Sequence, residues 1–503
     1  MLFPTGEFLL AYLPVTLALF FLIGSSLGQR AAASWLTVAS LCFYGLWRPV
    51  HVLLLVASIV FNYWAGGLIL NARVMGLETR ARFLVAVVVA VDLGVLAIFK
   101  YGDFLISSAA ALTGGHYPAL GLALPLGISF FTFTQIAYLV DVYAGKAVER
   151  SPLRYALFVT YFPHLVAGPV LHHSQMMPQF ADSEIYLPQL KGLANGMAFL
   201  LIGLFKKVLI ADSMAPLANA VFTAAGVGPI AGGEAWRGVL AYTLQIYFDF
   251  SGYSDMAVGL SLLFNIRLPY NFNSPYQAGN ISDFWRRWHM TLSAFLRDYL
   301  YIGLGGNRHG AVRRYANLLV TMLLGGLWHG ASWTFVVWGG LHGIYLVINH
   351  AWRWLLGRGE NRIVNWFAAA TLRLTGWGLT MFAVVVAWVF FRASTFNSAW
   401  TLLRAMFGVV TTPAATAPGA VTVLAGDSTW QWLWISALLL GARWLPNSQE
   451  CIDGYLARWM EQRRDSAQQQ FRAVLLGFAM VIAVLLVVIC ESRNVTEFIY
   501  FNF

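Results

Sequence analysis

The chain has 503 residues, of which 59% are hydrophobic and only 11% are charged. A soluble globular chain carries about 25% charged residues, so this composition excludes a soluble globular protein, a disordered chain and a small disulfide scaffold. The net charge of +10 comes from basic residues that lie mostly in short gaps between apolar runs, which is typical of membrane topology anchors and not of a nucleic-acid-binding domain. The sequence therefore predicts an all-α polytopic membrane protein that has the lipid bilayer, and no nucleic acid, as a partner.

Apolar runs follow one another along the whole chain. The first continues to about Gly28 with no basic segment before it, so we interpret it as a retained span and not as a cleaved signal. At roughly 20 apolar residues per span, the length of the chain predicts about ten to twelve transmembrane helices. Further runs lie at 33–47, 50–70, 83–99, 119–143, 155–171, 192–210, 236–264, 315–352, 366–391, 430–445 and 473–490.

Glycine and proline interrupt several of these runs, as at residues 125–127 and 163–169. Broken helix at membrane depth is tolerated only where protein or a water-filled cavity surrounds it. We therefore expect re-entrant segments around a central chamber. Basic residues indicate the orientation, because Arg30, the loop at 71–83 and the polar segment at 453–472 are all predicted to be cytoplasmic. This places both the N-terminus and the C-terminus outside.

The stretch at 315–352 contains no Asp, Glu, Lys or Arg. As one helix it would be about 57 Å long at 1.5 Å per residue, which exceeds a hydrocarbon core of about 30 Å, so it must break. The glycines at 325–330 predict the break there, with His329 at the interruption. An ionisable residue at such depth is a functional candidate, and the alternative is a neutral imidazole that bonds a carbonyl released by the broken helix.

His342 follows His329 by thirteen positions, a rotation of about 220° beyond three full turns on one helix. The two imidazoles are therefore predicted to point to different faces and not to chelate a metal. The motif HExxH is absent, and Cys42, Cys451 and Cys490 are far apart without a CxxC pair, so we expect no metal site.

Aromatic and basic residues alternate at 283–299, in a stretch predicted to be helical from an N-cap near Ser282. An interfacial helix explains such a pattern, although it explains His289 less well. A glycine-rich turn at 303–308 follows, and no GxxxxGK[ST] phosphate loop occurs. Basic residues beside glycine amides can hold a phosphorylated ligand. The candidates for that role are Arg286, Arg287, Asn307, Arg308, Arg313 and Arg314.

Two carboxylates, Asp249 and Asp255, lie in an aromatic and otherwise apolar segment. Buried carboxylates are costly unless they are paired. The sequence leaves two sets of partners open, the arginines of residues 286–314 or Lys206 and Lys207. A G-x-S-x-G motif is absent, so a serine hydrolase is not supported.

In these segments the sequence resembles the membrane-bound O-acyltransferase family. Within it, the chain is most similar to the bacterial branch that contains the alginate O-acetyltransferase, teichoic-acid D-alanyltransferase and peptidoglycan acetyltransferase membrane components. The resemblance covers most of the first 350 residues in order, and little of the last 150. It is carried by PLGISFFTFTQIAYLVDVYAGK at 125–146, FPHLVAGPV at 162–170, FKKVLIAD at 205–212, YFDFSGYSDMAVGL at 247–260, FWRRWHMTLSAFLRDYLYIGLGGNRHG at 284–310 and LLGGLWHGASWTFVVWGGLHG at 323–343.

The resemblance implies a ring of tilted helices around a thinned centre, in the bacterial inner membrane. The chain is then one integral-membrane acyltransferase domain, 1–503, with a motif-bearing core at 120–350 and C-terminal helices with an outward tail at 351–503. The resemblance also implies a catalytic role for His329 in its Trp-His-Gly motif and for His289 in its Arg-Trp-His motif. The six arginine and asparagine candidates above become candidates for binding the phosphates of coenzyme A.

The implied reaction is acetyl transfer from cytoplasmic acetyl-CoA, which is a substrate, with no permanently bound cofactor. The implied acceptor system is an extracytoplasmic polysaccharide served by a periplasmic acetyltransferase partner. An alginate-like exopolysaccharide is our first expectation, and cellulose or peptidoglycan is the alternative. A non-catalytic transporter of an acyl donor or lipid-linked sugar stays open, because broken helices and midplane polar residues suit transporters too.

Four aromatic residues crowd the last six positions of the chain. An interfacial aromatic belt explains such a tail. The resemblance adds a second interpretation, because a similar terminal motif with a central tyrosine occurs in this branch. On that interpretation Tyr500 accepts the acetyl group near His329 and presents it on the outer side.

Overall fold

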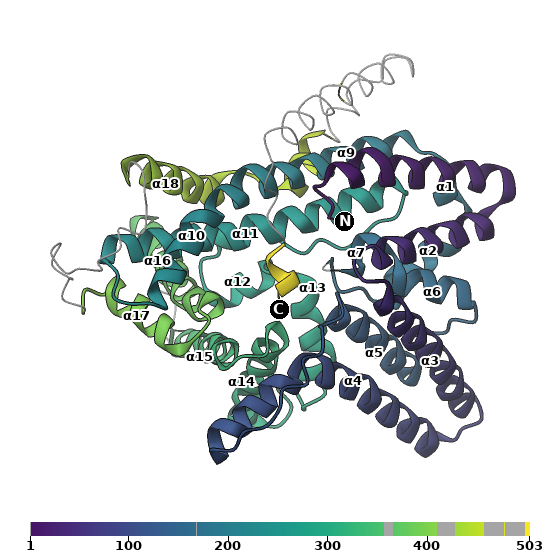
Figure 1. Ribbon diagram of the computed structural model, residues 1–503, viewed down its shortest axis with the longest axis horizontal. Coiled ribbons are helices and arrows are strands. Elements are labelled where there is room, and N and C mark those ends of the chain that lie inside the picture. The colour runs from purple at the N-terminus through teal and green to yellow at the C-terminus, as the bar shows by residue number, and fades with distance from the viewer. Residues whose placement is uncertain are drawn as a thin grey trace. The chain divides into compact units, whose positions relative to one another are not determined.

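The computed structural model describes residues 2–166, 168–356, 366–409, 428–456, 477 and 498–502. All regular secondary structure in these residues is helical, which confirms the predicted all-α class. The chain divides into two compact units, and α11 (Gly232–Leu263) contributes to both, changing units after Gly252 (Figure 1). The first unit comprises Met1–Leu204, Tyr253–Tyr270 and Tyr455–Asn502, and the second comprises Phe205–Gly252 and Asn271–Gly454.

The first unit is a set of helices joined by turns and loops. Gly28, with a φ of 87°, separates its first two long helices where the first span was predicted to end. Helices α3, α4 and α5 pack against one another, and α1 packs along α2 (Figure 1). Its elements are η1 (Phe8–Tyr12), α1 (Leu13–Leu27), α2 (Gln29–Gly45), α3 (Pro49–Val74), α4 (Glu78–Thr113), α5 (Ile128–Ala144), α6 (Pro152–Thr160), α7 (Phe162–Leu165), α8 (His173–Ala181), η2 (Ser183–Tyr186), α9 (Leu190–Leu204) and η7 (Ile499–Asn502).

The apolar run predicted at 119–143 is helical only in its second part. Residues 114–127 form no helix, and α5 begins at Ile128, directly after the interruption predicted at 125–127. Gly127 has a φ of 68° and lies against the backbone of Leu165 and Val166. A side chain at this position would be strained and would also collide, so glycine fixes the start of α5.

The second unit contains the short helices and the helical hairpin that carry most of the sequence-predicted site. Its hairpin consists of α14 and α15, and α15 also packs against α16 (Figure 1). Its elements besides α11 are η3 (Phe205–Ala211), α10 (Asp212–Ala225), η4 (Pro275–Gln277), α12 (Ile281–Arg287), α13 (Met290–Phe295), η5 (Leu296–Tyr301), α14 (Gly310–His329), α15 (Trp333–Leu356), α16 (Trp366–Arg392), α17 (Phe396–Met406), α18 (Ser428–Trp444) and most of η6 (Glu450–Leu456).

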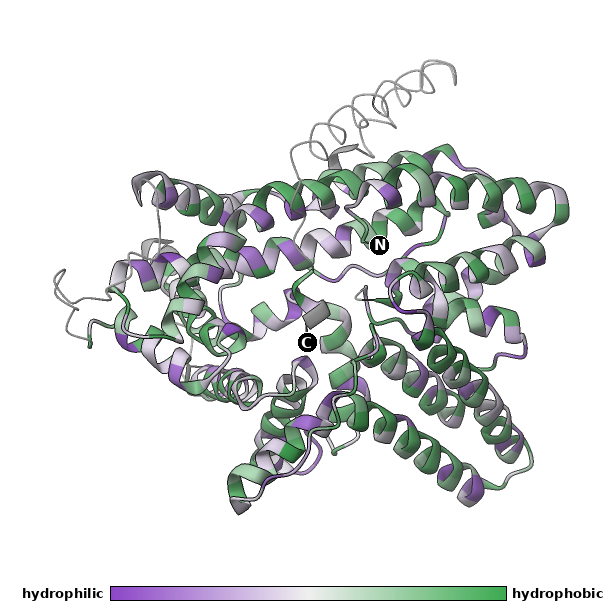
Figure 2. Cartoon of the chain, viewed as in Figure 1, coloured by the Kyte–Doolittle hydropathy of each residue, from purple (hydrophilic) through white to green (hydrophobic). Residues whose placement is uncertain are grey.

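Several helices are long and apolar enough to cross a membrane, and long stretches of them are green in the hydropathy colouring of Figure 2. This confirms a multi-pass membrane protein. The total of ten to twelve spans stays a prediction, and the run predicted at 473–490 lies, except for Gly477, outside the described residues. Among the described residues, the helices that are both long enough and apolar enough to span a membrane are Phe8–Leu27, Pro49–Val74, Glu78–Thr113, Leu190–Ala225 and Thr371–Arg392.

The charge-free stretch at 315–352 breaks where predicted. Helix α14 ends at His329, Gly330 is extended, and α15 begins at Trp333. Two other glycines serve packing and not the break, because Gly326 and Gly339 are helical and lie face to face. A Cβ placed on Gly326 would lie 3.0 Å from the Cα of Gly339. The glycines therefore let the two helices of the hairpin approach closely.

Candidate active site

His329 lies at the tip of the α14–α15 hairpin, inside an aromatic cage. It is the last residue of α14, and its side chain is buried, with 2% of the residue exposed. The ring centroids of Trp328, Trp338 and Phe391 lie 4.9, 5.0 and 5.2 Å from that of His329. The cage excludes bulk water from the imidazole and leaves it among apolar rings.

His289 lies at a sharp reversal of the chain between two short helices. The continuous helix predicted from Ser282 is wrong, because α12 ends at Arg287 and His289 has left-handed backbone angles, with φ 43° and ψ 54°. The N-cap is Asn280, whose Oδ1 accepts a hydrogen bond from the backbone N–H of Asp283 at 2.9 Å. Left-handed angles are strained for a residue with a Cβ, and such strain occurs most often at functional sites.

The reversal places the His289 ring in the interior of the second unit, fully buried. Its Nδ1 lies 3.0 Å from Oδ1 of Asn271, and its ring makes an edge contact with Phe250 of α11 at 4.7 Å. Residues 281–301 lie outside the five helices that qualify as spans. Burial lowers the pKa of the His289 imidazole to about 3, so this ring is neutral at physiological pH.

The structure brings the two sequence-predicted histidines together. The ring centroids of His289 and His329 are 6.3 Å apart, and Trp328 contacts both rings, at 6.0 Å and 4.9 Å. Two buried imidazoles at this separation can act on the same small reacting group, one as a proton acceptor and the other as its positioning partner.

A third imidazole belongs to the same aromatic cluster. The Trp338 ring lies 5.0 Å from His329 and 4.8 Å from His342, so it contacts both histidines. His342 is fully buried, and its Nδ1 accepts a hydrogen bond from Nε1 of Trp285 at 3.3 Å. Within the described residues, no group of three or more His, Cys, Asp or Glu side chains is arranged to hold a metal ion.

The candidates for phosphate binding are distributed over two segments of the second unit. Arg287 is engaged, because its Nε pairs with Asp283 at 2.9 Å and its Nη1 donates to the carbonyl of Asn273 at 3.2 Å. Nη2 of Arg314 lies 3.5 Å from Nδ1 of His350. The exposed candidates are Arg286, Asn307, Arg308 and Arg313.

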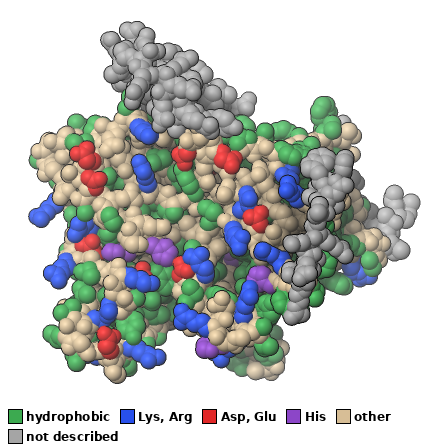
Figure 3. Space-filling view, turned by 180° about the vertical axis from the view of Figure 1, so that it is seen from behind, with side chains coloured by type: hydrophobic (Ala, Val, Ile, Leu, Met, Phe, Trp, Pro, Cys, Tyr) green, Lys and Arg blue, Asp and Glu red, His purple; other side chains and the backbone are tan. Residues whose placement is uncertain are grey.

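Arg313 and Arg314 lie near the start of α14, which begins at Gly310, and His329 is its last residue. From position 313 to position 329 the helix rises about 24 Å at 1.5 Å per residue. The cationic end and the histidine end of α14 are therefore far apart. On the face shown in Figure 3, Lys and Arg side chains are spread over separate places and are not gathered in one patch.

Asp249 is paired with Lys207, which is one of the two sets of partners that the sequence leaves open. Nζ of Lys207 lies 2.8 Å from an oxygen of Asp249 and 2.8 Å from an oxygen of Asp212. Lys207 and Asp249 are 3% and 1% exposed. This buried ion cluster fixes α11 just before Phe250, the residue that contacts His289. Asp255 belongs to the first unit.

Tyr500 belongs to the first unit, in η7. Its ring stacks on Phe498 at 5.5 Å, and Phe498 stacks on Tyr253 at 4.4 Å. Tyr500 is 7% and Phe498 2% exposed, so these two rings are packed inside the protein and do not form an interfacial belt.

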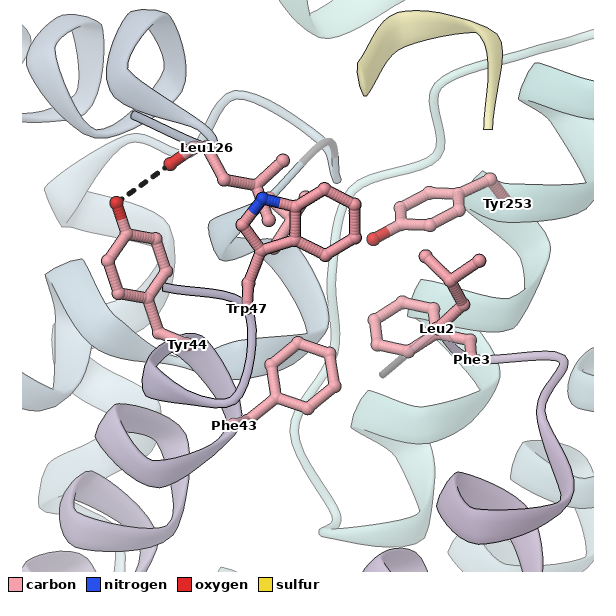
Figure 4. A pocket seen from close by; sticks show the side chains of 8 residues that line it. Leu2, Phe3, Phe43, Tyr44, Trp47, Leu126 and Tyr253 are labelled. Carbon is pink, nitrogen blue, oxygen red and sulfur yellow. Dashed lines mark hydrogen bonds between the residues drawn. The ribbon is translucent and has the colours of Figure 1, made fainter. Parts of the chain in front are cut away.

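A small pocket beside Tyr253 belongs to the same unit (Figure 4). Tyr253 and the N-terminal Phe3 line it, and their rings stack at 4.9 Å. The hydroxyl of Tyr44 donates to the carbonyl of Leu126 at 3.0 Å on its opposite side. The pocket has a volume of about 10 Å³, roughly the space of one water molecule.

Sequence reasoning missed Asn271 and the cage residues Trp338 and Phe391. Asn271 lies in a segment without a helix, where asparagine is common in turns and gives no functional signal. The two aromatic residues lie in apolar helices in which every ring looks like core. The feature that marks Asn271, a buried polar side chain bonded to His289, exists only in the folded protein.

The sequence matches one protein family and is similar to several named proteins. Residues 149–400 match the membrane-bound O-acyltransferase family. The chain is 42% identical to the peptidoglycan O-acetyltransferase of Helicobacter pylori, over 81% of this chain and 80% of that protein. It is 44% identical to the probable alginate O-acetylase AlgI of Pseudomonas aeruginosa, over 81% of this chain and 75% of that protein. A teichoic acid D-alanyltransferase of Bacillus subtilis is 29% identical over 48% of this chain and 64% of its own length. The chain belongs to the membrane-bound O-acyltransferase family.

Proposed function

We propose that this protein transfers acetyl groups from cytoplasmic acetyl-CoA toward O-acetylation of an extracytoplasmic polysaccharide. The observation that carries this proposal is the pair of buried imidazoles, His289 and His329, with ring centroids 6.3 Å apart in an aromatic cage. The names of the relatives, alginate O-acetylase and peptidoglycan O-acetyltransferase, support the same class of acceptor.

His329 acts as the general base in this reaction. It takes the proton of the acceptor hydroxyl while the hydroxyl oxygen attacks the carbonyl carbon of the thioester. The new C–O bond forms, the C–S bond breaks, and the imidazolium returns the proton to the leaving thiolate. Histidine suits both steps because its unperturbed pKa is near neutrality. The aromatic cage keeps water away from the thioester, which suppresses hydrolysis.

The exposed cations of the second unit bind the phosphates of the donor. Coenzyme A carries its phosphates and its thioester at opposite ends of a long flexible arm. Arg313 and Arg314 at the start of α14, with His329 at its end, offer the same separation of charge and chemistry. Arg286, Asn307 and Arg308 supply further donors of hydrogen bonds. Arg287 has a mainly structural role, because it is paired with Asp283.

The acceptor is an alginate-like exopolysaccharide, with cellulose or peptidoglycan as the alternative. Relatives named for alginate and for peptidoglycan are about equally similar to this chain, so similarity alone does not choose between them. A periplasmic acetyltransferase partner completes the transfer, and the protein resides in the inner membrane with both termini outside. Tyr500 carries the acetyl group outward as an ester of its hydroxyl.

Reconstituted full-length protein distinguishes an enzymatic function from a transport function. Proteoliposomes receive radiolabelled acetyl-CoA, and both free thiol and transferred label are measured. His329→Ala is expected to lower turnover by at least about 100-fold, since removing a general base costs roughly 10² to 10⁴. The matched control is His116→Ala, an exposed histidine of the first unit, which keeps wild-type turnover. Intact acetyl-CoA accumulating in vesicles, undiminished in His329→Ala, contradicts the proposal and supports a transporter.

A further inference from the structure

Asn271 is fully surrounded by protein, with 2% exposure, and its side-chain oxygen is the meeting point of three polar contacts. The backbone N–H of Thr291 donates to Oδ1 at 3.3 Å, and the hydroxyl of the same residue donates at 3.0 Å. Nδ1 of His289 lies 3.0 Å from the same oxygen. The three contacts converge from α13 and from the reversal that precedes it.

This convergence determines which atom of the Asn271 amide faces His289. A backbone N–H of Thr291 is a donor only, so the atom it meets must be the carbonyl oxygen and not the amide nitrogen. An amide turned the other way would place its NH₂ group against that donor. The orientation of Asn271 therefore follows from the hydrogen bonds around it.

The hydrogen bond to Oδ1 of Asn271 determines the tautomer of His289. Because Oδ1 of Asn271 only accepts, Nδ1 of His289 must carry the proton. In a neutral imidazole the other nitrogen, Nε2, then has a lone pair and no proton. Within the described residues this Nε2 is buried and has no hydrogen-bond partner. It is a buried acceptor on a ring whose centroid lies 6.3 Å from that of His329.

We infer that Asn271 is a positioning residue which holds His289 in the Nδ1–H tautomer. In this tautomer Nε2 of His289 accepts a hydrogen bond from the acceptor hydroxyl and donates none to the thioester carbonyl. This role rests on the proposed function, and it chooses between two roles of His289. Polarising the thioester would require an N–H directed at its carbonyl oxygen, and Nε2 has none in this tautomer. Accepting this hydrogen bond holds the hydroxyl in the site before the transfer, and its single O–H then turns to His329, which removes the proton.

The backbone of Asn271 secures the same arrangement. Its carbonyl accepts a hydrogen bond from the backbone N–H of Met290 at 2.9 Å, and the N–H of Asn273 donates to the carbonyl of Arg287 at 2.9 Å. The segment that carries Asn271 is thus bonded on both sides of the left-handed His289. The groups in contact with the His289 ring include Phe250, Asn271, Trp328 and His329.

The tautomer is tested by solid-state NMR on the full chain in lipid bilayers, with histidine ring nitrogens labelled. His289 is assigned by its loss in His289→Gln. We expect a protonated Nδ1 and a bare Nε2 in the wild type, and a mixture of tautomers in Asn271→Leu. A wild-type His289 with its proton on Nε2 overturns the inference whatever the activity of the protein.

Turnover in proteoliposomes tests the consequence. Asn271→Leu is expected to lower kcat by about 10- to 100-fold, the usual cost of losing a partner that orients a functional histidine, with KM for acetyl-CoA nearly unchanged. Asn271→Asp retains an acceptor for Nδ1–H and is expected to restore most of kcat. Its carboxylate also stabilises the imidazolium, so the pKa of His289 is expected to rise in this variant, which the labelled ring nitrogens report in the same NMR experiment.

Thr291→Val is the matched control, because it removes another donor from the same oxygen and leaves the His289 bond in place. It is expected to keep the wild-type kcat and pH profile. If Asn271→Leu keeps wild-type kcat while His329→Ala is inactive, Asn271 has no positioning role and the proposed function stands. If His329→Ala also keeps full turnover, the proposed function itself has failed.

Discussion

Replacing Lys207 by methionine is expected to destabilise the second unit strongly. The ammonium lies 2.8 Å from an oxygen of Asp249 and 2.8 Å from one of Asp212. At an effective dielectric constant of about 20, each contact corresponds to about 6 kcal/mol of Coulomb attraction, and desolvation offsets much of this. Removing one partner of a buried ion pair typically costs about 3 to 5 kcal/mol, because the remaining charge is left uncompensated.

The assay is reversible unfolding of the purified full chain in mixed micelles with increasing denaturing detergent. Lys206→Met is the matched control, because it is the same substitution one position earlier at a half-buried site. Nζ of Lys206 donates to the neutral hydroxyl of Ser448 at 2.7 Å, so the expected loss is about 1 kcal/mol. The double variant Lys207→Met/Asp249→Asn is expected to regain part of the stability, since one of the two carboxylates is neutralised.

A loss in Lys207→Met no larger than in Lys206→Met would show that water reaches the cluster and screens its charges, and that the ion pair is not buried in solution. The consequence extends to activity, since Asp249 immediately precedes Phe250 in α11. The Phe250 ring packs against His289 with centroids 4.7 Å apart. Loosening the ion cluster is therefore expected to lower turnover even at temperatures at which the variant stays folded.

Two further predictions concern the hairpin and the tail. Gly339→Ala is expected to cost about 1 to 3 kcal/mol of unfolding free energy in the same assay, because the new Cβ meets the backbone carbonyl of Met322, which cannot move aside. Gly340→Ala is its control, since that Cβ lies 3.3 Å from a flexible methyl group of Leu323, and equal stability of the two variants would contradict the packing argument. Tyr500→Phe keeps the stack on Phe498 and is expected to keep stability while losing acetyl transfer to the outer side, as followed by intact mass of protein trapped during turnover. Transfer at the wild-type rate in that variant would disprove the relay.

Composition alone was enough to predict a multi-pass helical protein, because so few charges cannot cover a water-soluble surface of this size. The break at His329 also follows from a single length, the thickness of the membrane. A charge-free stretch at 315–352 is longer than a membrane is thick, and glycine marks where it yields. Family resemblance then named both histidines. The last two conclusions depend on the order and spacing of residues along the chain, whereas the first needs only the composition.

Pairing across the chain needed the folded structure. Lys207 compensates Asp249, Asn271 bonds His289 across eighteen positions, and Phe391 joins the cage from another helix. The continuous helix predicted from Ser282 is also wrong because of contacts across the chain. The hydrogen bonds that stabilise the reversal at His289 come from the distant 271–273 segment. Local preferences say which residues can pair, but burial decides which do, because a buried polar group must find its partner within the protein.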